Sequence, residues 1–223
     1  MSKKLFILLF ISLLSFSFSA HEDDESQLGL LVVDELFKLP EPLKNGGATF
    51  NEALSERKSS RDFDNSKLLT LQQVSQALWT CDGPNRKDGH RTSPSAVAWY
   101  PLEIYVFLEE GIFYYNATEH ALITKKKGDY RKLAGGQKFV ADARMNFVIL
   151  GDFEKKSSLD GKDDQKLKYF YIEAGHCTMN LGLYAAANKM KGVERGMIDD
   201  MIVDFLGLDT KRYKLGISFS LGF

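Results

Sequence analysis

A nine-residue stretch, Ser55 to Phe63 (SERKSSRDF), concentrates basic and hydroxyl side chains in a chain whose overall charge is nearly balanced. Arginine presents a rigid fork of N–H donors that matches a phosphate group, and serine adds a short donor that needs little space. Arg57, Lys58 and Arg61 are therefore candidate anion ligands. The alternative is an exposed turn, because a basic segment between structured regions is often only solvated.

Two other segments carry residues that could border a ligand. A polar loop at residues 85–101 (NRKDGHRTSPSAVAWYP) ends in Trp99 and Tyr100, and this pair of aromatics favours a flat partner beneath the loop. Its Pro-Ser pair at residues 94–96 is also compatible with an ordinary turn. The segment VERG, residues 193–196, follows the longest expected helix, and its glycine is equally compatible with a simple turn.

The elements that would position these segments begin with a long helix at residues 168–190. Ile172 and Met179 recur seven residues apart on one stripe, and several glycines and alanines would let another helix approach closely. We expect this helix to be central, to lie at a subunit contact, and to end at Lys191-Gly192 by a glycine stop.

Shorter elements surround it. Thr70 is a helix cap followed by apolar residues at helical spacing up to Gly83-Pro84, which predicts a helix there. Apolar, β-prone runs predict a hairpin with strands at residues 102–108 and 112–116, and two further strands at residues 144–152 and 213–223. Two short helices are expected at residues 137–143 and 201–206. Strands and helices do not alternate regularly, so the fold class is α+β.

Several classes of function are disfavoured. Lys and Arg number 29 against 30 Asp and Glu, so no global field favours nucleic acid as a partner. No glycine-rich dinucleotide or P-loop motif occurs, and the four histidines are scattered without metal-ligand spacing, so we expect no metal site. Cys81 and Cys177 could form one disulfide in an oxidising compartment. We expect unpaired thiols, because both lie in apolar helical segments.

The N-terminus reads as a secretory signal peptide at residues 1–20, with two lysines, an apolar run from Leu5 to Leu14 and small residues up to Ala20. The apolar run is shorter than the roughly 20 residues that a spanning helix needs, which argues against a membrane anchor. We therefore expect an exported protein, periplasmic or secreted, with no membrane contact after cleavage. A lead-in at residues 21–54 would precede a domain at residues 55–223.

Taken together, the segments ERKSSRDF, DGPNRKDGHRTSPSAVAWYPLEIYVF and EAGHCTMNLGLYAAANKMKGVERGM resemble the nitroreductase family of flavin enzymes. The resemblance is closest to its dehydrogenase branch, which includes azoline-oxidising enzymes. It implies an α+β fold with an antiparallel-rich mixed sheet flanked by helices. It also implies a homodimer built on long helices, with FMN at the interface.

The resemblance assigns the cofactor site residue by residue. Arg57, Ser59 and Arg61 would contact the phosphate and ribityl chain, and Lys58 would lie near the pyrimidine edge of the isoalloxazine ring. A loop from the other subunit and a backbone stretch that faces flavin N5 would complete the site, through Pro94, Ser95, Ala96, Glu194, Arg195 and Gly196. Polar residues of the long helix are assigned structural roles, and no acid–base residue can be named.

This chain departs from the family pattern in three ways. No basic residue follows Lys214, although the family commonly completes the phosphate site there. The Lys-Tyr pair of azoline-oxidising members has no good match, since Lys168-Tyr169 lies too close to Glu173. Export would also require another electron donor than the cytosolic nicotinamides.

We expect an FMN-dependent oxidoreductase that passes hydride to a nitroaromatic, quinone or unsaturated compound. The alternatives are an exported non-enzymatic flavin-binding or degenerate scaffold protein and a peptide-modifying flavin dehydrogenase.

Overall fold

The computed structural model describes residues 33–223, so the predicted signal peptide and the start of the lead-in lie outside the described residues. The described chain forms a seven-stranded sheet in the order β1-β4-β3-β2-β5-β7-β6. The strands are β1 (Leu36–Lys38), β2 (Leu102–Phe107), β3 (Gly111–Asn116), β4 (Ala121–Lys127), β5 (Met145–Asp152), β6 (Lys191–Arg195) and β7 (Tyr213–Gly222).

All strand pairs of this sheet are antiparallel. Parallel pairing occurs in the isolated bridges that join Val33 to Thr124 and Ser59 to Gly192. The α+β class with an antiparallel-rich sheet is thereby confirmed.

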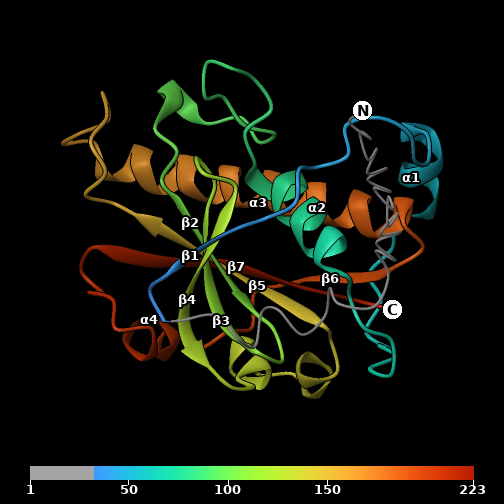
Figure 1. Cartoon of the computed structure of the whole chain (residues 1–223). Coiled ribbons are helices and arrows are strands. Elements are labelled where there is room, and N and C mark those ends of the chain that lie inside the picture. Colours follow the sequence, from blue (N-terminus) through green and yellow to red (C-terminus); the bar gives the residue numbers. More distant parts are fainter. Residues whose placement is uncertain (1–32) are drawn as a thin grey trace, which may run out of the picture.

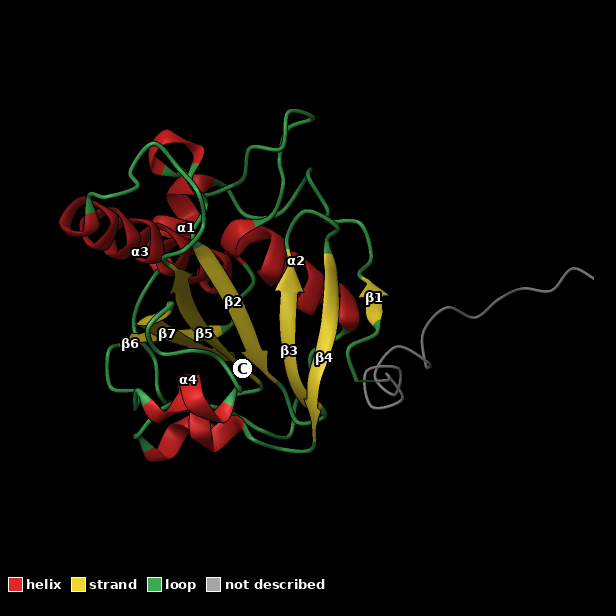
Figure 2. Cartoon of the chain, turned by 90° about the vertical axis from the view of Figure 1, so that its left-hand side faces the viewer, coloured by secondary structure: helices red, strands yellow, loops and turns green. Residues whose placement is uncertain are grey.

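Helices cover both faces of the sheet (Figures 1 and 2). On one face lie α1 (Phe50–Glu56), α2 (Leu71–Asp82) and α3 (Asp163–Ala187), and on the other lie α4 (Met201–Phe205) and the 3-10 turns η3 (Arg131–Ala134) and η4 (Lys138–Ala141). A further 3-10 turn, η2 (Ala96–Ala98), lies in the loop before β2. Within the described residues, no helix is long and apolar enough to cross a membrane.

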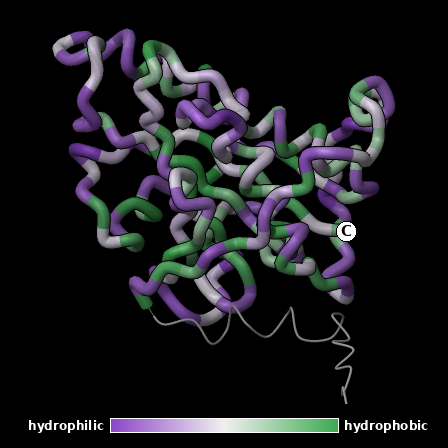
Figure 3. Tube along the Cα trace, turned by 45° about the horizontal axis from the view of Figure 1, so that its top comes forward, coloured by the Kyte–Doolittle hydropathy of each residue, from purple (hydrophilic) through white to green (hydrophobic). Residues whose placement is uncertain are grey.

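Two hydrophobic cores hold these layers together. The larger core lies between the sheet and helices α2 and α3, where Phe170 and Leu181 are fully buried. The smaller core packs Val148 and Leu150 of β5 against Val203 of α4. In Figure 3 the apolar segments accordingly gather in the middle of the trace, and hydrophilic segments dominate the outer loops. Burial on both faces explains why all eight residues of β5 are buried.

Helix α2 forms where the sequence predicts it. The Thr70 hydroxyl accepts a hydrogen bond from the backbone N–H of Gln73, and the Gln73 side chain accepts one from the Thr70 amide, which is a complete capping box. The amide of Gly83 closes the other end on the Trp79 carbonyl. Both signals are local in sequence, which explains the agreement.

The expected bounds of the long helix are wrong at both ends. Helix α3 begins at Asp163, where two acidic residues in the first turn favour the positive end of the helix dipole. It ends at Ala187, and Lys189 then adopts a positive φ of 56°. Gly192 is no helix stop but a strand residue that pairs with Leu221 of β7. A glycine is needed there because a Cβ would lie 2.6 Å from the Phe219 ring.

The described part of the lead-in, residues 33–54, packs onto the domain. Strand β1 extends the sheet at its β4 edge, and Leu39 enters the larger core. Ser75 of α2 donates a hydrogen bond of 2.6 Å to the carbonyl of Pro40, and His120 contacts the same carbonyl. These contacts anchor the chain at Leu39 and Pro40, about ten residues before α1.

Candidate functional site

The basic segment after α1 lies against the edge of the sheet. A capping box between Thr49 and Glu52 starts α1, and the chain leaves this helix in an extended conformation at Arg57. The amide of Ser60 then donates a hydrogen bond of 2.9 Å to the carbonyl of Gly192 on β6. Helix α1 and strand β6 therefore hold the segment at both ends.

The cations of this segment are available to a ligand. Arg57, Lys58 and Arg61 are exposed, and within residues 33–223 their side chains form no ion pair with Asp or Glu. The aliphatic part of Arg57 covers Gly182 of α3, with its Cγ 3.7 Å from the position of a glycine Cβ. Unpaired guanidinium groups next to serine hydroxyls suit a phosphate group.

Lys191 is a further cation that the sequence analysis did not select. It opens β6 opposite Gly222 of β7, and its ammonium group donates a hydrogen bond to the carbonyl of Asp62. It therefore lies beside the basic segment and beside the C-terminal strand, which itself carries no cation after Lys214. The sequence offered one signal that could have identified Lys191, namely its position two residues before the predicted segment 193–196.

The segment Glu194–Gly196 follows Lys191 and contacts α3. The carboxylate of Glu194 accepts a hydrogen bond from the Thr178 hydroxyl on α3. Gly196 is exposed, and a Cβ built there would meet no atom within 4 Å. Open space thus adjoins this stretch of backbone, as a planar ligand lying against it would require.

The Arg195 side chain points away from that open space into the protein. Its guanidinium donates to the Ala134 carbonyl at 2.8 Å and to Asn146 Oδ1 at 3.3 Å, and its Nε has no partner among the described residues. Burial lowers the pKa of Arg195 to about 10. Only the backbone of Arg195 can face a ligand, and the buried guanidinium instead fixes the course of β6 beneath it.

The Pro94–Ala96 segment continues into a strained turn. Val97, Ala98 and Tyr100 all have positive φ, between 48° and 52°. This conformation costs non-glycine residues about 1–3 kcal/mol each and is unusual for β-branched valine. The Val97 side chain is nevertheless 62% exposed, so burial of this side chain does not explain the turn. Strain of this kind is typical of functional loops.

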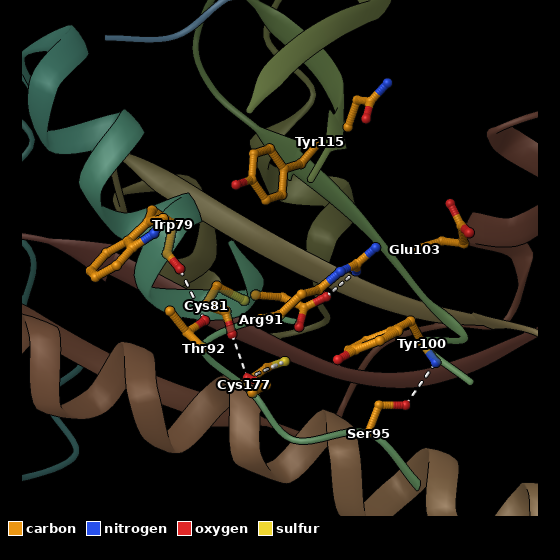
Figure 4. A network of polar contacts seen from close by, with 12 residues as sticks. Trp79, Cys81, Arg91, Thr92, Ser95, Tyr100, Glu103, Tyr115 and Cys177 are labelled. Atoms are coloured by element: carbon orange, nitrogen blue, oxygen red, sulfur yellow. Dashed lines mark hydrogen bonds and ion pairs between the residues drawn. The ribbon is translucent and has the colours of Figure 1, made fainter. Parts of the chain in front are cut away.

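The expectation that Trp99 covers a flat ligand is wrong. Trp99 is buried, and its indole N–H donates to the Lys155 carbonyl at 3.0 Å. Its ring meets Phe153 edge to face, with a centroid separation of 5.7 Å. Tyr100 is partly buried and lies beside Arg91, whose guanidinium carbon is 4.8 Å from the ring centroid (Figure 4). Both aromatics anchor the loop rather than a ligand.

A buried ion pair supports this loop from below. Asp82 at the end of α2 accepts a hydrogen bond of 2.5 Å from Arg91, and the two groups line a small polar cavity with Glu103 and Lys155. Burial raises the pKa of Asp82 to about 6, although Arg91 opposes the shift. Beside the pair, Cys81 and Cys177 are free buried thiols, as expected.

The unfolding free energy is expected to depend on pH through Asp82. Because its folded-state pKa lies above the ordinary 3.8, the folded chain binds this proton more tightly, and stability falls as pH rises from about 4 to about 6. A difference of about 2 pKa units corresponds to about 3 kcal/mol. The Asp82→Asn variant should therefore gain about that much relative to wild type over this range in urea titrations. A difference that does not vary with pH would contradict this.

Polar residues of α3 have the structural roles expected for them. Glu173 is buried and accepts a hydrogen bond of 2.8 Å from the Ala96 amide. Asn180 donates to the Ser93 hydroxyl at 3.2 Å, and His176 is exposed. No group of three or more His, Cys, Asp or Glu that could hold a metal occurs among residues 33–223.

One chain brings together only part of the predicted site. Arg57 of the basic segment contacts α3 at Gly182, Lys191 reaches the same segment at Asp62, and Glu194 contacts α3 at Thr178, whereas Ala96 is bound at Glu173. Gly182 and Glu173 are nine residues apart, which is about 14 Å along a helix axis. The loop therefore lies too far from the basic segment for one chain to close a compact site around the phosphate end.

Comparisons with known proteins give a consistent result. The model of the Nitroreductase family matches residues 54–223. A protein of Methanocaldococcus jannaschii that carries a nitroreductase name is 31% identical over 174 residues, which cover 74% of this chain and 86% of the relative.

Two solved structures are similar as well. A crystal structure from Ralstonia eutropha, also described as a nitroreductase, has a TM-score of 0.77 and 29% identity, covering 86% of this chain and 91% of that one. A structure from Desulfovibrio desulfuricans determined in complex with FMN shares the fold, with a TM-score of 0.54, 19% identity, and coverage of 79% of this chain and 87% of that chain.

Proposed function

This chain belongs to the nitroreductase family of oxidoreductases, and on that premise we propose that it binds FMN between the two subunits of a homodimer. Bound FMN supplies hydride transfer through N5, from a small-molecule donor to a small organic acceptor. The acceptor is a nitroaromatic, a quinone or an unsaturated compound. The proposal includes export directed by residues 1–20.

The observation that carries the proposal is a group of unpaired cations beside open backbone. We assign the FMN phosphate to Arg57 and Arg61, which are exposed, with Ser59 as a short donor. Lys58 is assigned to the pyrimidine edge of the ring, where a cation stabilises the negative charge of the reduced cofactor. The exposed backbone at Gly196 supplies the surface against which the ring lies.

A second copy is needed because the Pro94–Ala96 loop lies far from the basic segment of its own chain. The outer face of α3 suits such a contact. Ile172 and Met179 are 44% and 49% exposed there, and a Cβ at Gly175 would meet nothing within 4 Å. An apolar helix face with a small residue between large ones favours close packing of two helices.

Reconstitution of the purified mature protein tests the proposal. We expect it to bind FMN stoichiometrically as a dimer, to be bleached by dithionite or NADPH, and to be reoxidised rapidly by a quinone or nitroaromatic. Light scattering and flavin absorbance measure these properties. A colourless protein that gains no FMN on reconstitution would overturn the proposal and favour a scaffold that has lost the cofactor.

The position of Lys191 predicts a measurable contribution to FMN binding. Lys191→Ala removes one partly exposed cation, so we expect the Kd for FMN to rise about fivefold, in line with about 1 kcal/mol for one such hydrogen bond. Lys189→Ala, which removes an exposed lysine two residues earlier, is the matched control. Equal Kd values for the two variants would exclude Lys191 from the phosphate site.

A further inference from the structure

We propose that Glu173 is a positioning residue that fixes the strained Ser95–Tyr100 turn in the shape with which it meets FMN bound by the partner subunit. The inference rests on the proposed function. It goes further because it assigns a specific task to a buried carboxylate that contacts no part of the basic segment.

The contacts of Glu173 single it out. Its Oε1 accepts the Ala96 N–H at 2.8 Å. The neighbouring Ser95 oxygen accepts the Tyr100 N–H at 2.7 Å (Figure 4). Glu173 therefore holds the start of the turn at Ala96, and Ser95 beside it closes the turn on the Tyr100 amide.

A second set of contacts holds the end of the turn independently. The Lys155 ammonium donates a hydrogen bond of 2.5 Å to the Tyr100 carbonyl, and the Trp99 indole donates to the Lys155 carbonyl. Arg91 lies over the Tyr100 ring and is itself held by Asp82. The turn is thus held at both ends by groups from other parts of the chain.

Among residues 33–223 the tip of the turn, Val97 and Ala98, is left exposed. Val97 is 62% exposed, and Pro94 and Ala98 are exposed beside it. A chain relaxes unfavourable φ values unless its surroundings impose them. Here the surroundings impose them on Val97 and Ala98, which are exposed among the described residues, and this indicates a surface shaped in advance for a partner. A rigid apolar tip suits the face of a flavin ring.

The geometry predicts different results for two substitutions of Glu173. Glu173→Ala removes the hydrogen bond to the Ala96 N–H at the start of the turn, and we expect about tenfold weaker FMN binding together with faster amide hydrogen exchange at Ala96. Glu173→Gln keeps an oxygen that accepts the Ala96 N–H, so its exchange rate should stay close to wild type. We expect the visible circular dichroism of bound FMN to change in Glu173→Ala and to be restored in Glu173→Gln.

The other end of the turn gives an independent test if Glu173→Ala folds poorly. Lys155→Ala removes the contact with the Tyr100 carbonyl and should also weaken FMN binding and alter its circular dichroism. Lys156→Ala, at a side chain that is 93% exposed, is the matched control and should leave both unchanged.

The outcomes separate this inference from the proposed function. If the wild-type protein binds no FMN, the proposed function fails, and the exchange rate at Ala96 still tests whether Glu173 holds the turn. If the wild-type protein binds FMN, while Glu173→Ala and Lys155→Ala bind it as tightly and with an unchanged spectrum, the positioning role is overturned. Unaltered Ala96 exchange in Glu173→Ala would overturn it as well.

Discussion

Replacing Arg57 and Arg61 together by alanine is expected to abolish FMN binding at micromolar concentrations without unfolding the dimer. Hydrogen bonds to charged groups contribute about 1.5–3 kcal/mol each. Losing two of them therefore raises the Kd by roughly two to four orders of magnitude. Both side chains are exposed and form no ion pair with the described residues. Fluorescence titration with FMN measures the affinity, and thermal unfolding of the apo-protein checks the fold.

The matched control is the Lys132→Ala, Lys211→Ala double variant. It removes the same two positive charges from exposed positions on the other side of the sheet. Nonspecific electrostatic attraction of a phosphate would weaken equally in both double variants, whereas a specific site responds only in the arginine variant. Full FMN retention after loss of both arginines would contradict the assigned phosphate site.

Gly135→Ala is expected to destabilise the fold beneath the site. A Cβ at this position would lie 1.8 Å from Nη1 of Arg195, which is buried and hydrogen-bonded to the Ala134 carbonyl. Overpacking costs about 1–3 kcal/mol, and the displaced guanidinium loses hydrogen bonds of similar worth. We expect a loss of about 3 kcal/mol in unfolding free energy, which corresponds to a fall in Tm of about 6–12 °C.

The neighbouring glycine provides a sharp comparison. A Cβ at Gly136 would meet the Met197 side chain at 3.5 Å or more, an ordinary contact. Gly136→Ala should therefore shift the Tm little. Since Arg195 also fixes the backbone of β6, Gly135→Ala should weaken FMN binding in addition. Equal stability of the two alanine variants would show that Arg195 moves without cost.

The sequence predicted the elements whose signals are local. Helix α2 has its cap at Thr70, and the strands around residues 102–116 are continuous apolar runs. Strand β4 was not predicted, because its lysines at residues 125–127 hide its alternation. The start of β6 was predicted to be a helix stop because of Gly192. The glycine instead makes room for the Phe219 ring, and this contact joins segments that are distant in sequence.

Only part of the candidate site could be predicted from the sequence. The residue types at Arg57, Lys58 and Arg61 suggested an anion site, and the structure leaves these cations free. Three contacts could not be predicted from the sequence. The Arg195 side chain points into the protein, Lys191 contacts Asp62, and Glu173 accepts a hydrogen bond from the Ala96 amide. Each depends on the direction in which a side chain leaves its element or on a contact across the tertiary fold.

The bridge between Ser59 and Gly192 has a consequence for solubility. Strand β6 is the last strand of the sheet, and an uncovered edge offers N–H and C=O groups to a strand of another molecule. The basic segment, to which we assign the FMN phosphate, also covers that edge at Gly192. At the opposite edge, β1 has only three residues. We therefore expect release of the basic segment from β6 to favour edge-to-edge aggregation, and a ligand that holds the segment in place to oppose it.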